Sequence, residues 1–150
     1  MSGERVLRIA AAIILDARGR MLVVRKRGTT AFMQPGGKLE PGETGAQCLA
    51  RELEEELALR VEPAALLPLG RYTAPAANEA GWTVDCEVFR WDGLEAGPGS
   101  SGRTDRAARI GVRAELAEAR WASRAELLAL AAEGRLAPLT RDNLAAFLPG

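Results

Sequence analysis

The sequence predicts a single α/β domain in which strands and helices pack in layers around one hydrophobic core. Its length of 150 residues suits one core rather than two. The apolar share of 47% is ordinary for a globular protein. Strand-like and helix-like segments are interspersed along the chain, with no internal repeat, low-complexity tract or linker that would divide two cores. We therefore treat residues 1–150 as one domain.

The first part of the chain predicts strands. Val6–Leu15 is rich in branched apolar residues, and Asp16–Gly19 is a turn signal. Met21–Arg27 is the expected partner strand, so the two segments should form a hairpin. Gly28–Pro41 carries many turn residues and predicts a loop, with a short strand at about Phe32–Gln34.

The strongest helix signal follows this loop. Thr44 and Gln47 fit a capping box, T-x-x-Q, so a helix should begin near Gly45 and end near Leu57. Residues at the spacing i, i+3 and i+4 share a helix face. One such stripe is apolar and predicts the buried side of the helix; it consists of Ala46, Leu49, Ala50, Leu53 and Leu57.

Three carboxylates lie beside this apolar stripe. Glu52, Glu55 and Glu56 fall within an arc of about 100° on the helix. Neighbouring like charges on a helix cost roughly 0.2–0.5 kcal/mol per pair. The cluster is therefore expected to bind a cation, and grouped oxygen ligands suit Mg²⁺ or Mn²⁺. Considered by its spacing alone, an acidic helix face is more often simply solvated surface.

The middle of the chain predicts two strands and two connections. Ala64–Arg71 is a candidate strand, and Thr73–Gly81 a loop. Asp92–Arg113, rich in glycine and charge, is expected to be a mobile connection whose arginines keep it soluble rather than grip substrate. Thr83–Trp91 alternates as a half-buried strand does, and its apolar face carries Val84, Cys86 and Val88.

The C-terminal part predicts a strand and two helices. Glu118–Ala122 is a short strand. Ser123 and Glu126 form a second capping box, which should open a helix to about Ala132. A final short helix is expected to start at Thr140 and to end before residue 149.

Composition excludes several classes of function. Twenty basic residues balance twenty acidic ones, so no global charge attracts a nucleic acid polymer or an anionic membrane. No apolar run is long enough to span a bilayer. The run Ala10–Leu15 is short and soon followed by charge, which favours a core strand over a signal peptide. We expect a cytoplasmic protein.

The chain contains no histidine, which excludes Ser-His-Asp and Cys-His nucleophiles and histidine-bearing zinc sites. Acid–base work then falls to carboxylates, lysine, tyrosine or metal-bound water. Cys48 and Cys86 are expected to be reduced, partly buried thiols.

Residues 37–59, GKLEPGETGAQCLARELEEELAL, resemble the Nudix box of the Nudix hydrolase superfamily. That pattern is Gly, five residues, Glu, seven residues, then Arg-Glu-apolar-any-Glu-Glu-any-Gly-apolar. One position departs from it, because Ala58 stands where the family has glycine. Glycine suits the left-handed residue that ends a helix, and alanine costs about 1 kcal/mol there. The matches are Gly37, Glu43, Arg51, Glu52, Leu53, Glu55, Glu56 and Leu59.

The resemblance implies a Nudix-like α/β/α sandwich, with a mixed sheet between helices. It also implies Mg²⁺- or Mn²⁺-dependent hydrolysis of the diphosphate bond in a nucleoside diphosphate linked to a group X. Glu43 would support the site, and Arg51 would hold a glutamate by an ion pair. The metal ligands implied are Glu52, Glu55, Glu56 and the backbone carbonyl of Gly37.

The catalytic base is not fixed in this superfamily. Glu52 is one candidate to orient or deprotonate the attacking water. Glu115, which precedes the strand containing Arg120 and Trp121, is the candidate outside the box. The glycines of residues 36–42 do not form a P-loop, because no Gly-Lys-Ser/Thr follows them.

Substrate-binding residues are less clearly marked. Arg25 and Arg27 share a strand face. Each of them is a candidate to contact a substrate phosphate, and the alternative for each is a plain surface charge. Lys38 carries the same two alternatives. Four further side chains are candidates to contact the base of a nucleotide. The alternative is core filling for the aromatic ones and a turn for the asparagine. They are Phe32, Tyr72, Asn78 and Trp91.

The first substrate expectation is a nucleoside or deoxynucleoside triphosphate, oxidised forms included, cleaved to the monophosphate and pyrophosphate. ADP-ribose and nucleotide sugars are the enzymatic alternative. A nucleotide-sensing module without turnover is an alternative of another class, but the presence of all three box glutamates argues against it. The expected partner is a small nucleotide, with no nucleic acid polymer and no membrane; dimers are common among members of this superfamily, so a homodimer is left open.

Overall fold

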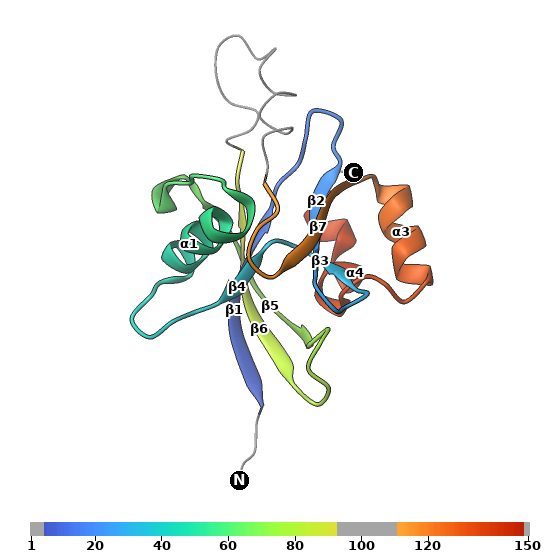
Figure 1. Ribbon diagram of the computed structural model, residues 1–150, viewed down its shortest axis with the longest axis horizontal. Helices are drawn as coiled ribbons and strands as arrows, with labels where there is room; N and C mark the ends of the chain where they lie inside the picture. The colour runs from blue at the N-terminus through green and yellow to red at the C-terminus, as the bar shows by residue number, and fades with distance from the viewer. Residues whose placement is uncertain (1–4, 93–110, 149–150) are drawn as a thin grey trace.

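The computed structural model describes residues 5–92 and 111–148, which form two β-sheets with helices on either side (Figure 1). Helix α1 (Gly45–Leu57) lies on one side of the sheets. Helices α3 (Arg124–Ala132) and α4 (Pro138–Asp142) lie on the other. The predicted α/β sandwich is confirmed. Most of the connection expected over residues 92–113 lies outside the described residues.

The larger sheet has the strand order β4–β1–β6–β5 and is mixed, as predicted. Strand β1 (Val6–Ile13) runs parallel to β6 (Thr83–Arg90) over its whole length. Strands β4 (Gly36–Lys38) and β5 (Leu67–Pro75) pair antiparallel at the two edges. Strand β5 therefore extends into the segment from Thr73 that the sequence predicted as loop.

The smaller sheet has the order β3–β2–β7 and is antiparallel. It consists of β3 (Phe32–Met33), β2 (Met21–Lys26) and β7 (Leu116–Ala122). The predicted hairpin between β1 and β2 is wrong, because the two strands belong to different sheets. The turn itself forms, since Asp16 Oδ1 accepts hydrogen bonds from the backbone N–H groups of Arg18 and Arg20.

Beyond this turn β1 and β2 separate, because β4 and β6 occupy the two edges of β1. The segment between them is held by the bridge Leu15–Met21 and by a hydrogen bond of 2.9 Å from Leu22 N–H to Ile14 O. A local turn signal therefore predicted the turn correctly and the pairing incorrectly.

Helix α1 has the predicted bounds and the predicted capping box. Thr44 Oγ1 accepts a hydrogen bond of 3.1 Å from Gln47 N–H, and Gln47 Oε1 accepts one of 3.0 Å from Thr44 N–H. At the other end Ala58 adopts φ = 59°, the left-handed conformation that favours glycine. Its N–H bonds to Glu54 O at 3.1 Å. The helix therefore ends with the expected geometry despite the alanine.

The C-terminal helices differ from the prediction in one place. Helix α3 begins after the Ser123–Glu126 capping box and ends at Ala132, as predicted. The last helix does not start at Thr140, because α4 already begins at Pro138 and is followed by α5 (Leu144–Phe147). Proline is favoured in the first turn of a helix, where its missing N–H has no partner to lose. A short 3₁₀ turn, η1 (Pro63–Ala65), precedes β5.

Two hydrophobic cores lie on opposite faces of the sheets, because alternate residues of a strand point to opposite sides. Ala10, Ala12 and Ile14 pack toward α1, together with its buried leucines. Ala11 and Ile13 pack toward the C-terminal helices. The apolar face predicted for β6 is buried as expected: Val84, Cys86 and Val88 join this second core. The first core anchors the acidic helix.

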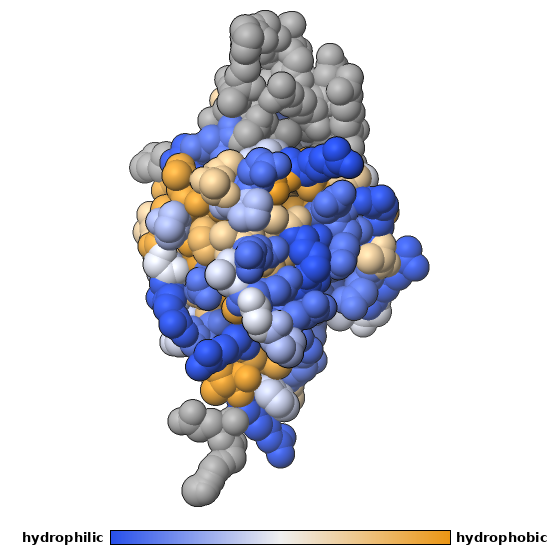
Figure 2. Space-filling model, turned by 90° about the vertical axis from the view of Figure 1, so that its left-hand side faces the viewer, coloured by the Kyte–Doolittle hydropathy of each residue, from blue (hydrophilic) through white to orange (hydrophobic). Residues whose placement is uncertain are grey.

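The surface on the α1 side is mostly hydrophilic, with apolar residues gathered mainly toward its margins (Figure 2). None of the helices in residues 5–92 and 111–148 has an apolar stretch long enough to cross a membrane.

Candidate active site

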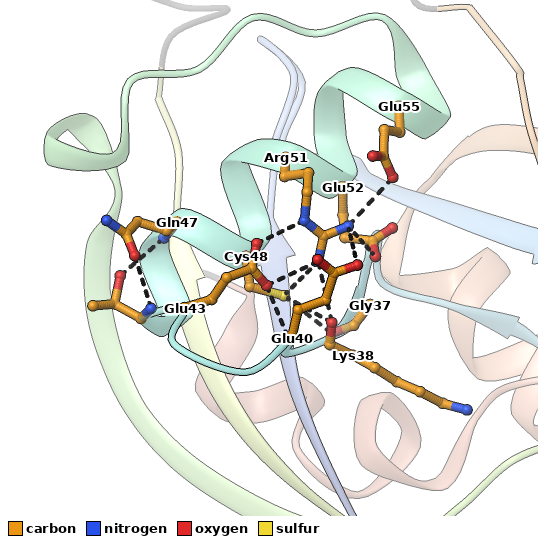
Figure 3. Close-up of polar contacts among 10 residues, drawn as sticks. Gly37, Lys38, Glu40, Glu43, Gln47, Cys48, Arg51, Glu52 and Glu55 are labelled. Atoms are coloured by element: carbon orange, nitrogen blue, oxygen red, sulfur yellow. Dashed lines mark hydrogen bonds and ion pairs between the residues drawn. The ribbon is translucent and has the colours of Figure 1, made fainter.

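Arg51 is the centre of the polar cluster on α1 (Figure 3). Its Nε lies 2.7 Å from Glu43 Oε2 and its Nη2 lies 2.9 Å from Glu43 Oε1, a bidentate pair. Its Nη1 donates to Glu52 Oε2 at 3.1 Å and to Glu55 Oε1 at 3.3 Å. One guanidinium thus holds three carboxylates in fixed relation, and charge-assisted bidentate contacts of this kind are the strongest such pairs.

Glu43 also closes the loop that precedes α1. Its Oε1 accepts a hydrogen bond of 2.9 Å from Glu40 N–H, while its own N–H donates to Glu40 O at 3.0 Å. The hydrogen bonds from Arg51 are the main reason that the pKa of Glu43 is lowered to about 2. Glu43 is therefore ionised across the physiological range, and it ties the loop to the helix through Arg51.

Gly37 on β4 lies directly against the carboxylate of Glu52. A β-carbon added at residue 37 would overlap both the carboxyl carbon and Oε2 of Glu52. The carbonyl oxygen of Gly37 accepts a hydrogen bond of 3.5 Å from Cys48 Sγ. Burial raises the pKa of the Cys48 thiol to about 12, so it stays protonated and acts as the donor in this contact. Only glycine allows the strand to approach the helix this closely.

Two carboxylates on α1, Glu52 and Glu56, are partly desolvated. Burial raises the pKa of Glu52, while the charge of Arg51 opposes the rise. Burial, followed by repulsion from Glu52, raises the pKa of Glu56 to about 7. Glu56 has only 6% of its surface exposed. The charge of Lys26 lowers the pKa of Glu56, whereas the charge of Glu115 raises it.

The donor chemistry of this cluster fits a hard divalent cation. Its side chains offer only carboxylate oxygens, and they repel one another in a half-buried setting that a cation would relieve. Gly37 brings its backbone directly against the Glu52 carboxylate, where a β-carbon would clash. As the side chains stand, Glu52 and Glu55 both contact Arg51. Within residues 5–92 and 111–148, no three Asp, Glu or Cys side chains are grouped closely enough to hold an ion without adjustment.

The basic residues on β2 divide between two tasks. Arg25 donates to Glu118 Oε1 at 3.0 Å and to Thr29 O at 2.7 Å, and Arg27 donates to Leu116 O at 3.3 Å. Arg25 therefore holds β2 to β7 and to the following turn, and Arg27, directly after β2, bonds to β7. Lys26, which no sequence motif marked, instead pairs with Glu115 at 3.8 Å, and its charge lowers the pKa of Glu56. Strand alternation offered the clue, because Lys26 points to the face opposite that of its neighbours.

Glu115 lies at the open side of the site. Its carboxylate is 69% exposed and lies 3.8 Å from Lys26 Nζ. Its charge raises the pKa values of Glu52 and Glu56. Lys38 points away from Arg51 in Figure 3 and pairs with Glu79 at 3.4 Å.

A pocket borders this cluster across β4 from α1. Its cavity volume is about 100 Å³, and its mouth is open to solvent. Its walls come from β1, β4, the loop after β5 and α4, and they include apolar side chains such as Leu7, Ile9 and Leu139. Gly37, Lys26 and Lys38 line it as well, so the pocket and the carboxylate cluster share a boundary.

The aromatic candidates fill the core instead of this pocket. Phe32 is fully buried beneath the guanidinium of Arg120, and the ring of Tyr72 packs edge-on against Phe147. Trp91 packs against the core on the α1 side. Asn78 does line the pocket, together with Gln34 and Thr140, two polar residues that no sequence motif marked.

A family model described as the NUDIX domain matches residues 6–142. The chain belongs to the NUDIX family. The NUDIX match includes the Arg51 cluster, Gly37 and the pocket, and it confirms the resemblance seen in residues 37–59. The solved structures agree on the fold: the MutT protein from Methanosarcina mazei Go1 matches with a TM-score of 0.69, covering 98% of this chain and 96% of that one, at 19% identity.

Two curated relatives carry functional names. The chain is 34% identical over 92 residues to the 8-oxo-dGTP diphosphatase of Escherichia coli (strain K12), covering 58% of this chain and 69% of that protein. It is 33% identical over 69 residues to Phosphatase NudJ of the same strain, covering 45% of each. For two further 8-oxo-dGTP diphosphatases, the matched segments span only 44% and 63% of the relative's length.

Proposed function

We propose that this NUDIX protein hydrolyses the diphosphate bond of a nucleotide with the help of Mg²⁺ or Mn²⁺. The observation that carries the proposal is the carboxylate cluster held by Arg51 beside Gly37, at the boundary of an open pocket lined by two lysines. Family membership supports the reaction class, and the acidic oxygens support the choice of metal.

The metal ligands would be Glu52, Glu55, Glu56 and the carbonyl oxygen of Gly37. When bound, the metal neutralises diphosphate charge and lowers the pKa of an attacking water. Arg51 keeps Glu52 and Glu55 in place, and its bidentate pair with Glu43 keeps the loop that follows β4 against the helix.

The remaining roles fall to residues around the pocket mouth. Lys26 and Lys38 line the pocket and would bind phosphate oxygens. Arg25 and Arg27, given their contacts with β7, would act at most indirectly on substrate. Glu52 would orient or deprotonate the attacking water, with Glu115 as the alternative base. Water attacks one phosphorus, the P–O–P bridge breaks, and a nucleoside monophosphate leaves with pyrophosphate.

A nucleoside or deoxynucleoside triphosphate, oxidised forms included, is the proposed substrate class. The names of the curated relatives from several bacteria favour it, although the matched segments are partial.

The test is a panel of nucleoside triphosphates, their oxidised forms, ADP-ribose and nucleotide sugars, incubated with Mg²⁺ or Mn²⁺ and scored for products by chromatography. Glu55→Gln and Glu56→Gln should each abolish most of the turnover. Glu54→Gln is the matched control, because Glu54 lies on the same helix, is exposed and pairs with Arg60. Full activity in both variants would refute the site, and tight binding without turnover would favour a sensing module.

A further inference from the structure

Gln34 carries a buried donor that nothing in the described structure satisfies. The side chain lies between β3 and β4 and has 5% of its surface exposed. Its Oε1 accepts a hydrogen bond of 3.0 Å from Thr140 Oγ1 on α4. Its Nε2 is buried and has no hydrogen-bond partner within residues 5–92 and 111–148. Buried donors are nearly always paired in folded proteins, because an unpaired one loses its bond to water without compensation.

The donor belongs to the pocket described above. Gln34 and Thr140 both line it, and apolar side chains such as Leu7, Ile9 and Met33 surround them. A ligand that enters this pocket is therefore the natural partner of Nε2. The neutral amide suits a neutral acceptor, whereas phosphate oxygens find charged partners at Lys26 and Lys38 on the same pocket.

Thr140 decides which end of the amide the pocket presents. A glutamine amide offers an acceptor at one end and donors at the other, and its orientation follows from the hydrogen-bond network. Thr140 is 1% exposed, and its hydroxyl donates to Oε1. With Oε1 engaged in this way, Nε2 is the end of the amide left for a ligand that enters the pocket.

We propose that Gln34 is a specificity-determining residue that donates from Nε2 to a carbonyl oxygen on the base of the nucleotide, with Thr140 as the positioning residue that sets its orientation. This inference rests on the proposed function, since it names the class of base that the same site accepts. Bases with a ring carbonyl, such as guanine, satisfy the donor. Bases without one leave it unpaired, and sites built to hydrogen-bond a substrate reject analogues that lack the matching group.

The experiment compares dGTP with the triphosphate of 2-aminopurine deoxynucleoside, which keeps the 2-amino group and lacks the carbonyl at C6. The wild-type protein should prefer dGTP in kcat/KM by about tenfold or more, which is the effect of one buried hydrogen bond. Gln34→Leu should remove most of this preference. It removes the unpaired donor but also the acceptor of the Thr140 hydroxyl, so the melting temperature should change little. Thr140→Val should reduce the preference, and Thr140→Ser, which keeps the hydroxyl, should retain it.

Calorimetry without metal measures the binding of dGMP and of the 2-aminopurine deoxynucleoside monophosphate. This measurement separates the inference about Gln34 from the proposed function. A wild-type preference for dGMP that Gln34→Leu abolishes supports the role of Gln34 even if no nucleotide is hydrolysed. Hydrolysis without any preference between the two bases, or a preference that survives in Gln34→Leu, overturns the role of Gln34 and leaves the proposed reaction intact. If Gln34→Leu fails to fold, the variants Thr140→Val and Thr140→Ser test the role of Gln34 in its place.

Discussion

The backbone of Gly37 runs so close to the carboxylate of Glu52 that no side chain fits between β4 and α1 at this point. Gly37→Ala should therefore displace Glu52 and lower kcat by about 100-fold, since a shift of about 1 Å in a catalytic group has this effect. Steady-state hydrolysis measures the loss. Gly111→Ala is the control, because a β-carbon there would meet its nearest neighbour at 3.5 Å, an ordinary contact. Wild-type kcat in Gly37→Ala would show that Glu52 need not stay where it lies.

Arg51→Lys tests whether a planar guanidinium is needed at the centre of the cluster. Lysine keeps the charge but cannot bond both oxygens of Glu43 while reaching Glu52 and Glu55. We expect kcat to fall by about 10- to 100-fold, on the order of 1–3 kcal/mol. Carboxyl titration by NMR should show the pKa of Glu43 rising from about 2 toward its usual value of 4.5.

The matched control for that substitution is Arg60→Lys, at a residue whose side chain is 91% exposed and pairs with Glu54 at 3.8 Å. This variant should keep wild-type activity. An unchanged pKa of Glu43 in Arg51→Lys would contradict the idea that the bidentate pair holds that carboxylate ionised.

Ala58→Gly should stabilise the protein. Ala58 adopts φ = 59°, where glycine carries no penalty and other residues do, so the gain should be about 1 kcal/mol. Urea unfolding measures it. Ala129→Gly, at an exposed position inside α3, should instead lower the free energy of unfolding by about 0.5–1 kcal/mol. Glycine there only adds conformational entropy to the unfolded chain. Equal losses in both variants would contradict the left-handed assignment.

The stability of the metal-free protein should fall as pH rises from about 5 to 7.5. Burial raises the pKa of Glu56 from 4.5 to about 7, so the folded state binds a proton that the unfolded state has already released within this window. Stability then decreases with pH, by up to about 3 kcal/mol for this group. Glu43 does not contribute here, because its lowered pKa leaves it ionised in both states above about pH 5.

Urea unfolding in the presence of a chelator, at pH 5 and at pH 7.5, measures this dependence. Glu56→Gln should flatten most of it, and Mg²⁺ should stabilise the wild-type protein more at pH 7.5 than at pH 5. A wild-type profile that rises with pH over this range, and that Glu56→Gln does not alter, would argue against a desolvated Glu56.

Features encoded in neighbouring residues could be predicted from the sequence. The Thr44–Gln47 and Ser123–Glu126 capping boxes predicted where α1 and α3 begin, and both bonds of each box are formed. The leucine spacing predicted which side of α1 is buried. These predictions succeed because helix caps and helix faces depend on residues three or four positions apart, within one or two turns of the chain.

Pairings between distant segments were not predictable in the same way. The turn at Asp16 forms, yet β1 pairs with β4 and β6 instead of β2, since a turn signal says nothing about the edges that other strands occupy. In the same way, the sequence marked Arg25 and Arg27 as phosphate-binding candidates. In the fold, Lys26 is the residue that pairs with Glu115 and lines the pocket.

By itself the sequence determined the α/β class, the acidic helix and the residues of the box, because each depends on short-range spacing or on a contiguous motif. Tertiary structure alone decided that Gly37 lies against Glu52, that Glu56 is desolvated, and that Gln34 and Thr140 line one pocket. Gln34 and Thr140 lie 106 positions apart in the chain. Burial and an unpaired donor are properties of surroundings assembled from several elements, so no local pattern records them.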